Sequence, residues 1–420
     1  MRSAPHPLVL VLAASALLGL DGCAGDDTSA SASEGDTETS GTTTPTGGSD
    51  TETSSSDATT GDTDTGTGTD TGTDTDADTT GGVVYDGEPL PPGEPGEWVW
   101  VDFPDAKCRT GAPTGIGVRY GSSDNLLIYL QGGGACFNTL TCLNNPGSYD
   151  SGDFSGWSGS WGGWGIFNQD RPENPVGDWN VVYIPYCSGD VFAGDREGVF
   201  IDEQPDPMDF VGHRNIDAFL QRVVPTFADA PEVLITGASA GGFGGGFNFI
   251  RFAEAFPKSG ISFVDDSAPI LGDEYVTPCL QQQWRDLWGL TETLPPGCDA
   301  CTGADGGGLT NIASYLAAAV PRANLGLISS TRDGTISIFY AFGVDDCSGF
   351  GTMPGGVFEA GLYEYRATQL GPSGWASYFI PSTEHVWTQN SDFYDTEVGG
   401  VLLTDWLQDL LDGVIVEVEP

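Results

Sequence analysis

Ser239 stands in a sequence pattern that could make it a nucleophile. Residues 237–241 (GASAG) fit the G-x-S-x-G pattern, and the apolar run Val233–Ile235 leads into them. A glycine-rich turn and then a helix over 247–256 are expected to follow. In such a strand, turn and helix context the serine is held out from the sheet, where a base can take its proton. The alternative is a glycine-rich turn with an incidental serine, because the bare pattern is common.

A serine hydroxyl is a poor nucleophile until a base removes its proton, and that base is usually a histidine held by a carboxylate. In α/β-hydrolases the chain order is serine, acid, histidine. His385 is the only histidine after Ser239, and it follows an apolar run that ends at Ile380. A loop at the carboxyl end of a strand suits a base. An ordinary surface histidine is the alternative.

Asp333 is the preferred partner for this histidine. It comes shortly after the apparent strand 324–329, two loops from the serine turn and at a suitable distance from His385. It could instead be a turn residue, because Asp-Gly is a common turn pair. Glu384 is adjacent to the base and is expected to point elsewhere. The rival acids are Asp265, Asp266, Asp345 and Glu384.

An oxyanion formed at Ser239 would need backbone N–H donors. One should come from Ala240, directly after the nucleophile, and others from the Gly132–Ala135 run after an early strand. Glycine allows the backbone to come within hydrogen-bond reach of a developing oxyanion.

The elements that must position these residues alternate along the chain. Continuous apolar runs suit strands buried on both faces of a parallel sheet, and helical stretches lie between them. This order predicts a doubly wound α/β sheet with helices on both faces. The expected strands are 126–130, 180–185, 233–236, 260–265, 324–329 and 375–380, and the expected helices include 215–224, 310–320 and 401–411.

Residues 151–167 show neither helix nor strand periodicity and carry Trp157, Trp161 and Trp164 among glycines and serines. They could form an aromatic loop that faces a substrate. Equally, the tryptophans could pin an irregular loop to the domain.

The chain divides into three parts. Residues 1–22 resemble a lipoprotein-type signal peptide, with an apolar run too short to span a membrane, and Cys23 would be the lipidated residue. Ordinary cleavage with free secretion is the alternative. Residues 23–85 are rich in Thr, Asp, Gly and Ser and predict a disordered acidic tether, because such a segment buries too little surface to offset its chain entropy. Residues 86–420 form the folded domain.

The net charge of −46 bears on possible partners. Residues 24–85 contain 14 acids and no bases, and Arg2 cancels Asp21, so the part from Asp86 onward carries −32. Nucleic acid is not expected as a partner, because phosphate binding needs basic patches. An acidic polysaccharide would also be repelled unless cations or a local basic patch intervene.

Eight cysteines remain when Cys23 is set aside, and an even set behind an export signal predicts disulfides. Cys298 and Cys301 have C-x-x-C spacing, which could also mean a redox pair or half of a zinc site. No second such pair exists, and only His213 and His385 offer imidazoles after the signal segment. We therefore expect structural disulfides and no metal. The residues are Cys108, Cys136, Cys142, Cys187, Cys279, Cys298, Cys301 and Cys347.

Three motifs together carry a resemblance: residues 130–138 (LQGGGACFN), 178–190 (DWNVVYIPYCSGD) and 237–242 (GASAGG). They are similar to the pectin acetylesterase family, which includes the Notum carboxylesterases, and the likeness extends over roughly residues 97–400. Many members have an acidic residue and a tryptophan where this chain has Gln131 and Gly134 or Ala135.

The resemblance implies an extracellular serine esterase with an α/β-hydrolase-like fold. It assigns the triad to Ser239, Asp333 and His385, and the oxyanion donors to Gly133, Gly134 and Ala240. It also implies the disulfides Cys136–Cys142 and Cys108–Cys187, with Cys279, Cys298, Cys301 and Cys347 pairing among themselves.

The sequence thus predicts an exported carboxylic ester hydrolase that needs no cofactor. An acetylated polysaccharide such as pectin is the expected substrate, by family analogy. The alternative within this class is a longer O-acyl chain on a lipid or a lipidated protein. A different class, a non-catalytic surface binding module, would also suit a tethered acidic domain. A lipid on Cys23 would hold the chain at the membrane of a bacterial cell envelope.

Overall fold

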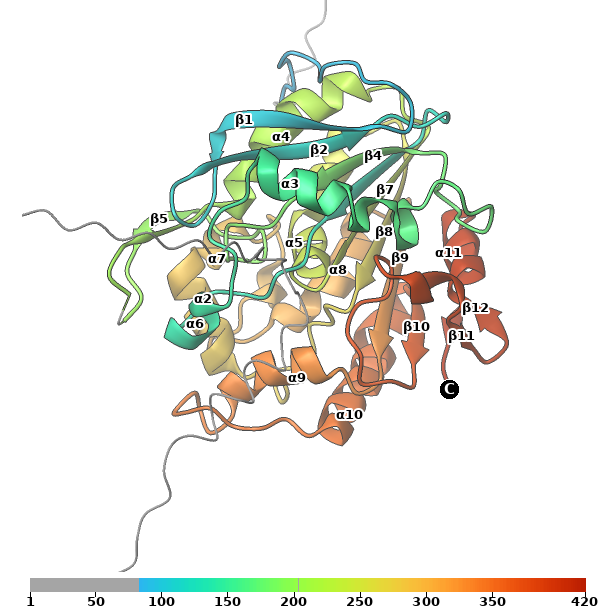
Figure 1. The fold of residues 1–420 in the computed structure, drawn as a ribbon. Coiled ribbons are helices and arrows are strands. Elements are labelled where there is room, and N and C mark those ends of the chain that lie inside the picture. The colour runs from blue at the N-terminus through green and yellow to red at the C-terminus, as the bar shows by residue number, and fades with distance from the viewer. Residues whose placement is uncertain (1–82, 203) are drawn as a thin grey trace, which may run out of the picture. The chain divides into compact units, whose positions relative to one another are not determined.

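The structure is a computed structural model that describes residues 83–202 and 204–420 (Figure 1). The expected signal segment, Cys23 and the tether up to residue 82 lie outside the described residues, so they remain predictions. Within the described ranges, no helix is both long and apolar enough to cross a bilayer.

A nine-stranded sheet forms the centre of the domain, and its strands run in the order β1-β2-β4-β3-β7-β8-β9-β10-β13. The pairs β1–β2 and β2–β4 are antiparallel, and every other neighbouring pair is parallel. The mostly parallel α/β sheet predicted from the sequence is therefore confirmed. The strands are β1 Trp98–Lys107, β2 Pro113–Arg119, β3 Leu126–Leu130, β4 Asn180–Ile184, β7 Glu232–Ala238, β8 Gly260–Asp266, β9 Ala323–Ser330, β10 Ala376–Ile380 and β13 Glu417–Val418.

Two small antiparallel ribbons lie outside this sheet: β5 (Arg196–Val199) with β6 (Met208–Phe210), and β11 (Glu397–Val398) with β12 (Val401–Leu402). The α-helices connect the strands and cover the sheet. They are α2 Thr139–Leu143, α3 Ser151–Ser158, α4 Gly212–Thr226, α5 Ala240–Ala255, α6 Pro278–Trp288, α7 Leu290–Thr293, α8 Ile312–Ala319, α9 Gly334–Tyr340, α10 Gly355–Tyr365 and α11 Leu403–Leu411.

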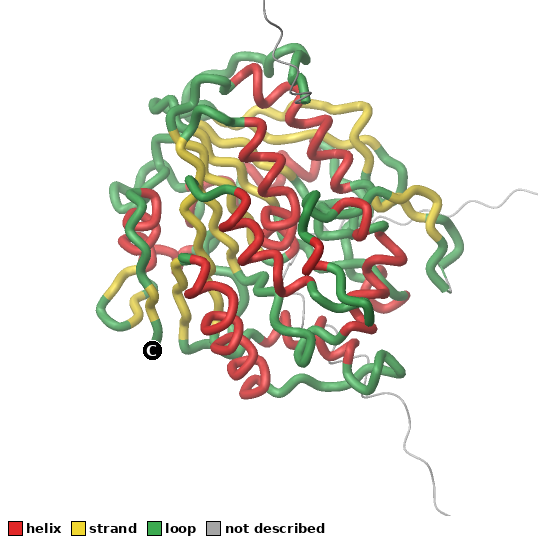
Figure 2. The backbone as a smooth tube through the Cα atoms, turned by 180° about the vertical axis from the view of Figure 1, so that it is seen from behind, coloured by secondary structure: helices red, strands yellow, loops and turns green. Residues whose placement is uncertain are grey.

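Helices pack on both faces of the sheet, as a doubly wound fold requires. Figure 2 shows α4, α5 and α8 lying across the strands on one face, and Figure 1 shows α3 and α11 on the other. Because side chains alternate along a strand, each central strand supplies both cores. Leu126, Ile128 and Leu130 of β3 join the first core, whereas Leu127 and Tyr129 join the second.

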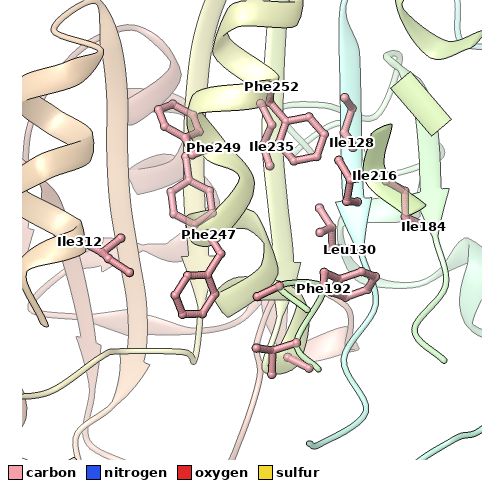
Figure 3. Close-up of a cluster of buried hydrophobic side chains, with 14 of the residues drawn as sticks. Ile128, Leu130, Ile184, Phe192, Ile216, Ile235, Phe247, Phe249, Phe252 and Ile312 are labelled. Carbon is pink, nitrogen blue, oxygen red and sulfur yellow. The ribbon is translucent and has the colours of Figure 1, made fainter. Parts of the chain in front are cut away.

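The first core is built around α5. Figure 3 shows Phe249 and Phe252 of this helix beside Ile235 of β7. Both rings are fully buried, and burial of such a side chain contributes about 1.5–3 kcal/mol to stability. This packing fixes the first turn of α5, and with it the end of β7, against the sheet.

The expected glycine-rich turn after Ser239 is wrong, because α5 begins at Ala240 and includes these glycines. Helix propensity disfavours glycine, but close packing demands it here. A Cβ on Gly241 would lie 2.0 Å from the carbonyl oxygen of Leu130, and one on Gly244 would lie 2.5 Å from the ring of Phe192. The helix therefore approaches β3 more closely than any side chain permits.

The expectation that residues 151–167 are irregular is also wrong at their start, where α3 forms. Asp150 and Asp153 make a capping box: Asp150 accepts hydrogen bonds from the N–H groups of Gly152 and Asp153, and the Asp153 carboxylate accepts one from the N–H of Asp150. Such a cap begins a helix without apolar periodicity.

The three tryptophans differ in their packing, and a substrate-facing role for the exposed pair stays a prediction. Trp157 stacks on Tyr183 with ring centroids 3.7 Å apart, so it pins the segment to the domain. Trp161 and Trp164 are 45% and 49% exposed, with centroids 5.0 Å apart.

The eight cysteines of the described part form four disulfides. Cys136–Cys142 and Cys108–Cys187 pair as the family resemblance implies, and the remaining four residues pair as Cys279–Cys347 and Cys298–Cys301. The C-x-x-C pair is therefore a disulfide in this structure. Within the described ranges, no cluster of three or more His, Cys, Asp or Glu residues could hold a metal ion.

His213, at the start of α4, makes the fold sensitive to acid. Burial, and then the charge of Arg251, lower the pKa of this imidazole to about 4, and Arg251 contacts His213 Nδ1 at 3.1 Å. Asp217 and Asp195 oppose this shift only in part. Because the pKa in the folded state lies below the ordinary value, the unfolded chain takes up the proton first. The contribution of His213 to the free energy of unfolding is fully present above about pH 6.5 and is lost as the pH falls toward 4.

We expect the melting temperature of the wild-type protein to drop between pH 7 and pH 4.5, with His213 accounting for on the order of 2 kcal/mol of that loss. Calorimetry on wild type and His213→Gln at both pH values measures this. Between these pH values, the melting temperature of the variant should fall a few degrees less than that of the wild type. Equal drops in the two proteins would mean that His213 does not contribute.

Candidate active site

Ser239 occupies the sharp turn between β7 and α5. Its backbone has φ 56° and ψ −119°, a conformation that costs a non-glycine residue about 1–3 kcal/mol. The turn is held because Ser239 N donates to the carbonyl oxygen of Asp266 at 2.8 Å, and because Gly237 and Gly241 allow contact with β3. Strain that the surroundings enforce is typical of functional sites. The elbow predicted from the G-x-S-x-G pattern therefore forms.

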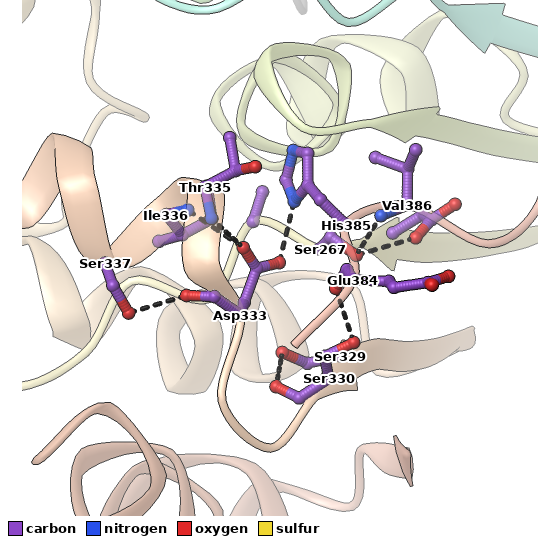
Figure 4. A network of polar contacts seen from close by, with 12 residues as sticks. Ser267, Ser329, Ser330, Asp333, Thr335, Ile336, Ser337, Glu384, His385 and Val386 are labelled. Atoms are coloured by element: carbon purple, nitrogen blue, oxygen red, sulfur yellow. Dashed lines mark hydrogen bonds and ion pairs between the residues drawn. The ribbon is translucent and has the colours of Figure 1, made fainter. Parts of the chain in front are cut away.

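Asp333 and His385 come together from two neighbouring strand ends (Figure 4). Asp333 Oδ2 lies 2.7 Å from His385 Nδ1. The other oxygen, Oδ1, caps α9 by accepting from Thr335 N and Ile336 N at 2.9 Å each. Asp333 is fully buried. Its side chain thus serves both as the helix cap and as the partner of the imidazole.

This pairing orients the histidine ring for base chemistry. A carboxylate accepts only, so Nδ1 carries the hydrogen and Nε2 keeps its lone pair. Nε2 is buried and has no hydrogen-bond partner among the described residues. A neutral imidazole in this tautomer can take a proton at Nε2 while the carboxylate stabilises the resulting cation.

Asp266 ties the serine turn to the histidine loop. Its backbone oxygen accepts from Ser239 N, and its carboxylate accepts from Trp387 N at 2.9 Å and from Thr388 N and Oγ1 at 2.7 Å each. Val386, next to His385, has φ 63° and donates its N–H to Ser267 Oγ. A β-branched residue at positive φ is a genuine outlier. The loop is therefore held in a strained conformation by the end of β8.

The rival acids occupy other positions. Asp266 anchors residues 387–388, and burial raises its pKa. Asp265 is buried and accepts from Ala268 N, and burial raises its pKa as well. Asp345 and Glu384 are exposed. Only Asp333, among the acids considered from the sequence, contacts His385 in the described structure.

The glycine loop after β3 lies beside the serine. Gly134 and Ala240 line the same cavity as Ser239. Neither of their N–H groups has an acceptor among the described residues, so both can serve a ligand oxygen. Gly134 has φ 78°, which favours glycine. Gly133, also predicted as a donor, precedes Gly134 but does not line the cavity.

A cavity of about 510 Å³, counting its open mouth, opens from Ser239. Its lining is almost wholly apolar and aromatic, and the hydroxyl of Tyr340 is occupied by the carbonyl oxygen of Pro269. Apolar walls with few polar groups suit the hydrocarbon part of a ligand. Besides Gly134, Ser239 and Ala240, the lining residues are Ala135, Phe137, Val191, Phe243, Phe247, Ile270, Trp284, Trp288, Ile336, Phe339 and Tyr340.

Sequence reasoning missed two supporting residues, Asp266 as an anchor and Asn145 beside the glycine loop. An adjacent acid pair at the end of a strand was a visible signal for Asp266, but its role as an anchor was not. Asn145 lies in the segment after α2 and donates to Gly133 O at 2.8 Å; no local pattern marks it.

The mostly parallel sheet, the serine turn at the end of β7 and the acid and histidine on later strands define an α/β-hydrolase-like protein. The solved structure of the Wnt deacylase Notum from Drosophila shares this fold, with a TM-score of 0.57, 19% identity, and coverage of 76% of this chain and 95% of that one. At this identity the likeness concerns the fold.

A sequence profile of the family described as Pectinacetylesterase matches residues 101–293. The chain is 32% identical over 166 residues to a palmitoleoyl-protein carboxylesterase NOTUM of Schmidtea mediterranea, covering 37% of this chain and 31% of that protein. It is 27% identical over 208 residues to pectin acetylesterase 5 of Arabidopsis thaliana, covering 47% and 48%. Residues 101–293 are therefore similar to the pectin acetylesterase and Notum family, in agreement with the resemblance carried by the three motifs.

These matches cover only part of this chain and part of each relative. The chain spans about a third of the Notum relative and about half of the Arabidopsis one. The profile includes the glycine loop and Ser239 but ends before Asp333 and His385. The assignment of those two residues therefore rests on the geometry described above.

Proposed function

We propose that this protein is a serine carboxylic ester hydrolase in which Ser239 is the nucleophile, His385 the base and Asp333 the residue that orients the base. The 2.7 Å contact between Asp333 and His385, with Nε2 left unpaired among the described residues, carries the proposal. The strained serine turn and the two unpaired N–H groups beside it support the proposal.

The proposed reaction has an acylation half and a deacylation half. His385 Nε2 takes the proton of Ser239 Oγ as that oxygen attacks the ester carbonyl, and the N–H groups of Gly134 and Ala240 receive the developing oxyanion. When the intermediate collapses, the imidazolium returns the proton to the leaving alcohol. Water then attacks the acyl-enzyme and gives its proton to His385, which passes it to Ser239 Oγ as the acid departs. No step requires a metal or an organic cofactor.

The cavity favours an acyl group longer than acetyl. Its lining is apolar and aromatic, and each methylene buried against such walls contributes about 0.8 kcal/mol, so an acyl chain longer than acetyl gains affinity. The charge of −32 on the folded part also disfavours a polyanionic chain such as pectin. The substrate class that the geometry supports best is therefore a longer O-acyl chain on a lipid or a lipidated protein. From the sequence, this class is the alternative to an acetylated polysaccharide.

Deacetylation of a polysaccharide remains the second candidate. The exposed pair Trp161 and Trp164 favours it, since aromatic faces also contact sugar rings. Ile166, two residues after Trp164, donates its N–H to Thr388 O, in the loop that carries His385. A sugar chain lying on these rings would therefore be near that loop.

A series of p-nitrophenyl esters from acetate to palmitate separates these candidates. We expect kcat/KM to rise about fourfold for each methylene that enters the cavity, reaching a maximum at a medium or long chain. Ala135→Leu, which narrows the cavity, should lower the ratio of the octanoate rate to the acetate rate at least about tenfold. A maximum at acetate, with release of acetate from neutral acetylated polysaccharides, would support the second candidate instead.

We infer that this activity operates outside the cytoplasm. Four disulfides fit an oxidising compartment. Attachment to the envelope through a lipid on Cys23 stays a prediction, which mass spectrometry of the N-terminal peptide can test.

A further inference from the structure

Asn145 lies buried directly behind the glycine loop. Only 6% of its surface is exposed, and its Nδ2 donates to the carbonyl oxygen of Gly133 at 2.8 Å. Its Oδ1 is buried and has no partner among the described residues. A reversed amide would set Oδ1 against the Gly133 carbonyl, so the donor assignment follows from the chemistry. Among the described residues, the amide donates to the loop and also lies near the buried hydroxyl of Tyr186.

This bond controls the direction of the next N–H group. Gly133 O and Gly134 N–H belong to the same peptide unit, and in a planar trans peptide they point in opposite directions. Fixing the oxygen toward Asn145 therefore turns the N–H of Gly134 away from it. Gly134 lines the cavity with Ser239, and glycines on both sides of this peptide would otherwise let it rotate.

The backbone of Asn145 is itself held by a buried arginine. The buried Arg109 donates from Nη2 to the carbonyl oxygens of Asn145 at 2.7 Å and of Cys142 at 3.2 Å. The disulfide Cys136–Cys142 closes the segment between the glycine loop and Asn145. The asparagine is therefore part of a cross-linked support.

We propose that Asn145 is a positioning residue that aims the Gly134 N–H at the oxyanion formed on Ser239. The inference rests on the proposed ester hydrolysis. It predicts an effect on the transition state alone, because Asn145 lines no part of the cavity. Removal of an oxyanion donor costs about 10²–10³ in kcat, so loss of its orientation should cost less.

Asn145→Leu, which keeps the volume but has no donor, should lower kcat on a p-nitrophenyl ester about 10- to 100-fold and leave KM within about twofold. Inhibition by an alkyl trifluoromethyl ketone, which forms a tetrahedral adduct on the serine, should weaken by a similar factor. Inhibition by the alcohol with the same alkyl chain should not change. Asn145→Ala serves as the second variant if the leucine variant does not fold.

Asn215→Leu is the matched control. Asn215 is also 6% exposed, and its Nδ2 also donates to a backbone oxygen, that of Lys107 at 2.7 Å. A folded Asn145 variant with kcat within about twofold of wild type, or with only a raised KM, overturns the inference. So does an equal loss of kcat in Asn215→Leu. Ser239→Ala, assayed in parallel, separates failure of the proposed function from failure of the inference about Asn145. If Ser239→Ala keeps the wild-type rate, the proposed function fails and the inference fails with it.

Discussion

Replacing Ser239 with alanine is expected to lower kcat for p-nitrophenyl butyrate by at least about 10³-fold. The hydroxyl oxygen is the atom that forms the acyl-enzyme, so its removal leaves only the oxyanion donors and the cavity to act on a water molecule. The substitution deletes one atom from a residue that is already almost buried. We therefore expect the melting temperature to stay close to that of the wild type.

Initial-rate kinetics on purified wild type and variant measure this effect. Ser377→Ala is the matched control, because Ser377 is a buried serine of β10 whose Oγ has no partner among the described residues. The control should keep the wild-type rate. Equal rates in wild type and Ser239→Ala would contradict the esterase proposal and favour the non-catalytic binding module.

Asp333→Asn is expected to lower kcat by about 10⁴. The reason lies in the two roles of this carboxylate. Oδ1 accepts two N–H groups from the first turn of α9, so the amide oxygen of asparagine must take that position. Its NH₂ then faces His385 Nδ1, which must accept, and the ring hydrogen moves to Nε2. The base is left in the wrong tautomer without a change in packing.

Single-turnover kinetics should show slower acylation and slower deacylation, because His385 takes a proton in both steps, and circular dichroism should show an unchanged fold. Asp345→Asn, at an exposed acid considered from the sequence, should change the rate by less than about twofold. A near-normal rate in Asp333→Asn would transfer the role to another acid, with Asp265 and Asp266 the first to be tested.

Local pattern was enough to predict most of the sheet. The apolar run Leu126–Leu130 coincides with β3, since a strand buried on both faces must be continuously apolar. The strand ends carry the loops on which Ser239, Asp333 and His385 lie. The start of α5 and the whole of α3 were missed because glycine packing against β3 and the capping box at Asp150 override propensity and periodicity.

The sequence by itself predicted the candidate nucleophile and the candidate base. Ser239 is set by its own turn, and His385 by elimination, because both depend on short-range pattern and composition. Only the tertiary structure distinguished the candidate acids, since Asp265 and Asp266 end one strand, Asp333 follows another, and among the described residues only Asp333 contacts the imidazole. The tertiary structure also identified the residues that hold the site in place. Asp266 bonds to residues 239 and 387–388, and Asn145 orients a loop twelve residues away. Such contacts depend on where distant segments meet, and no local spacing encodes that.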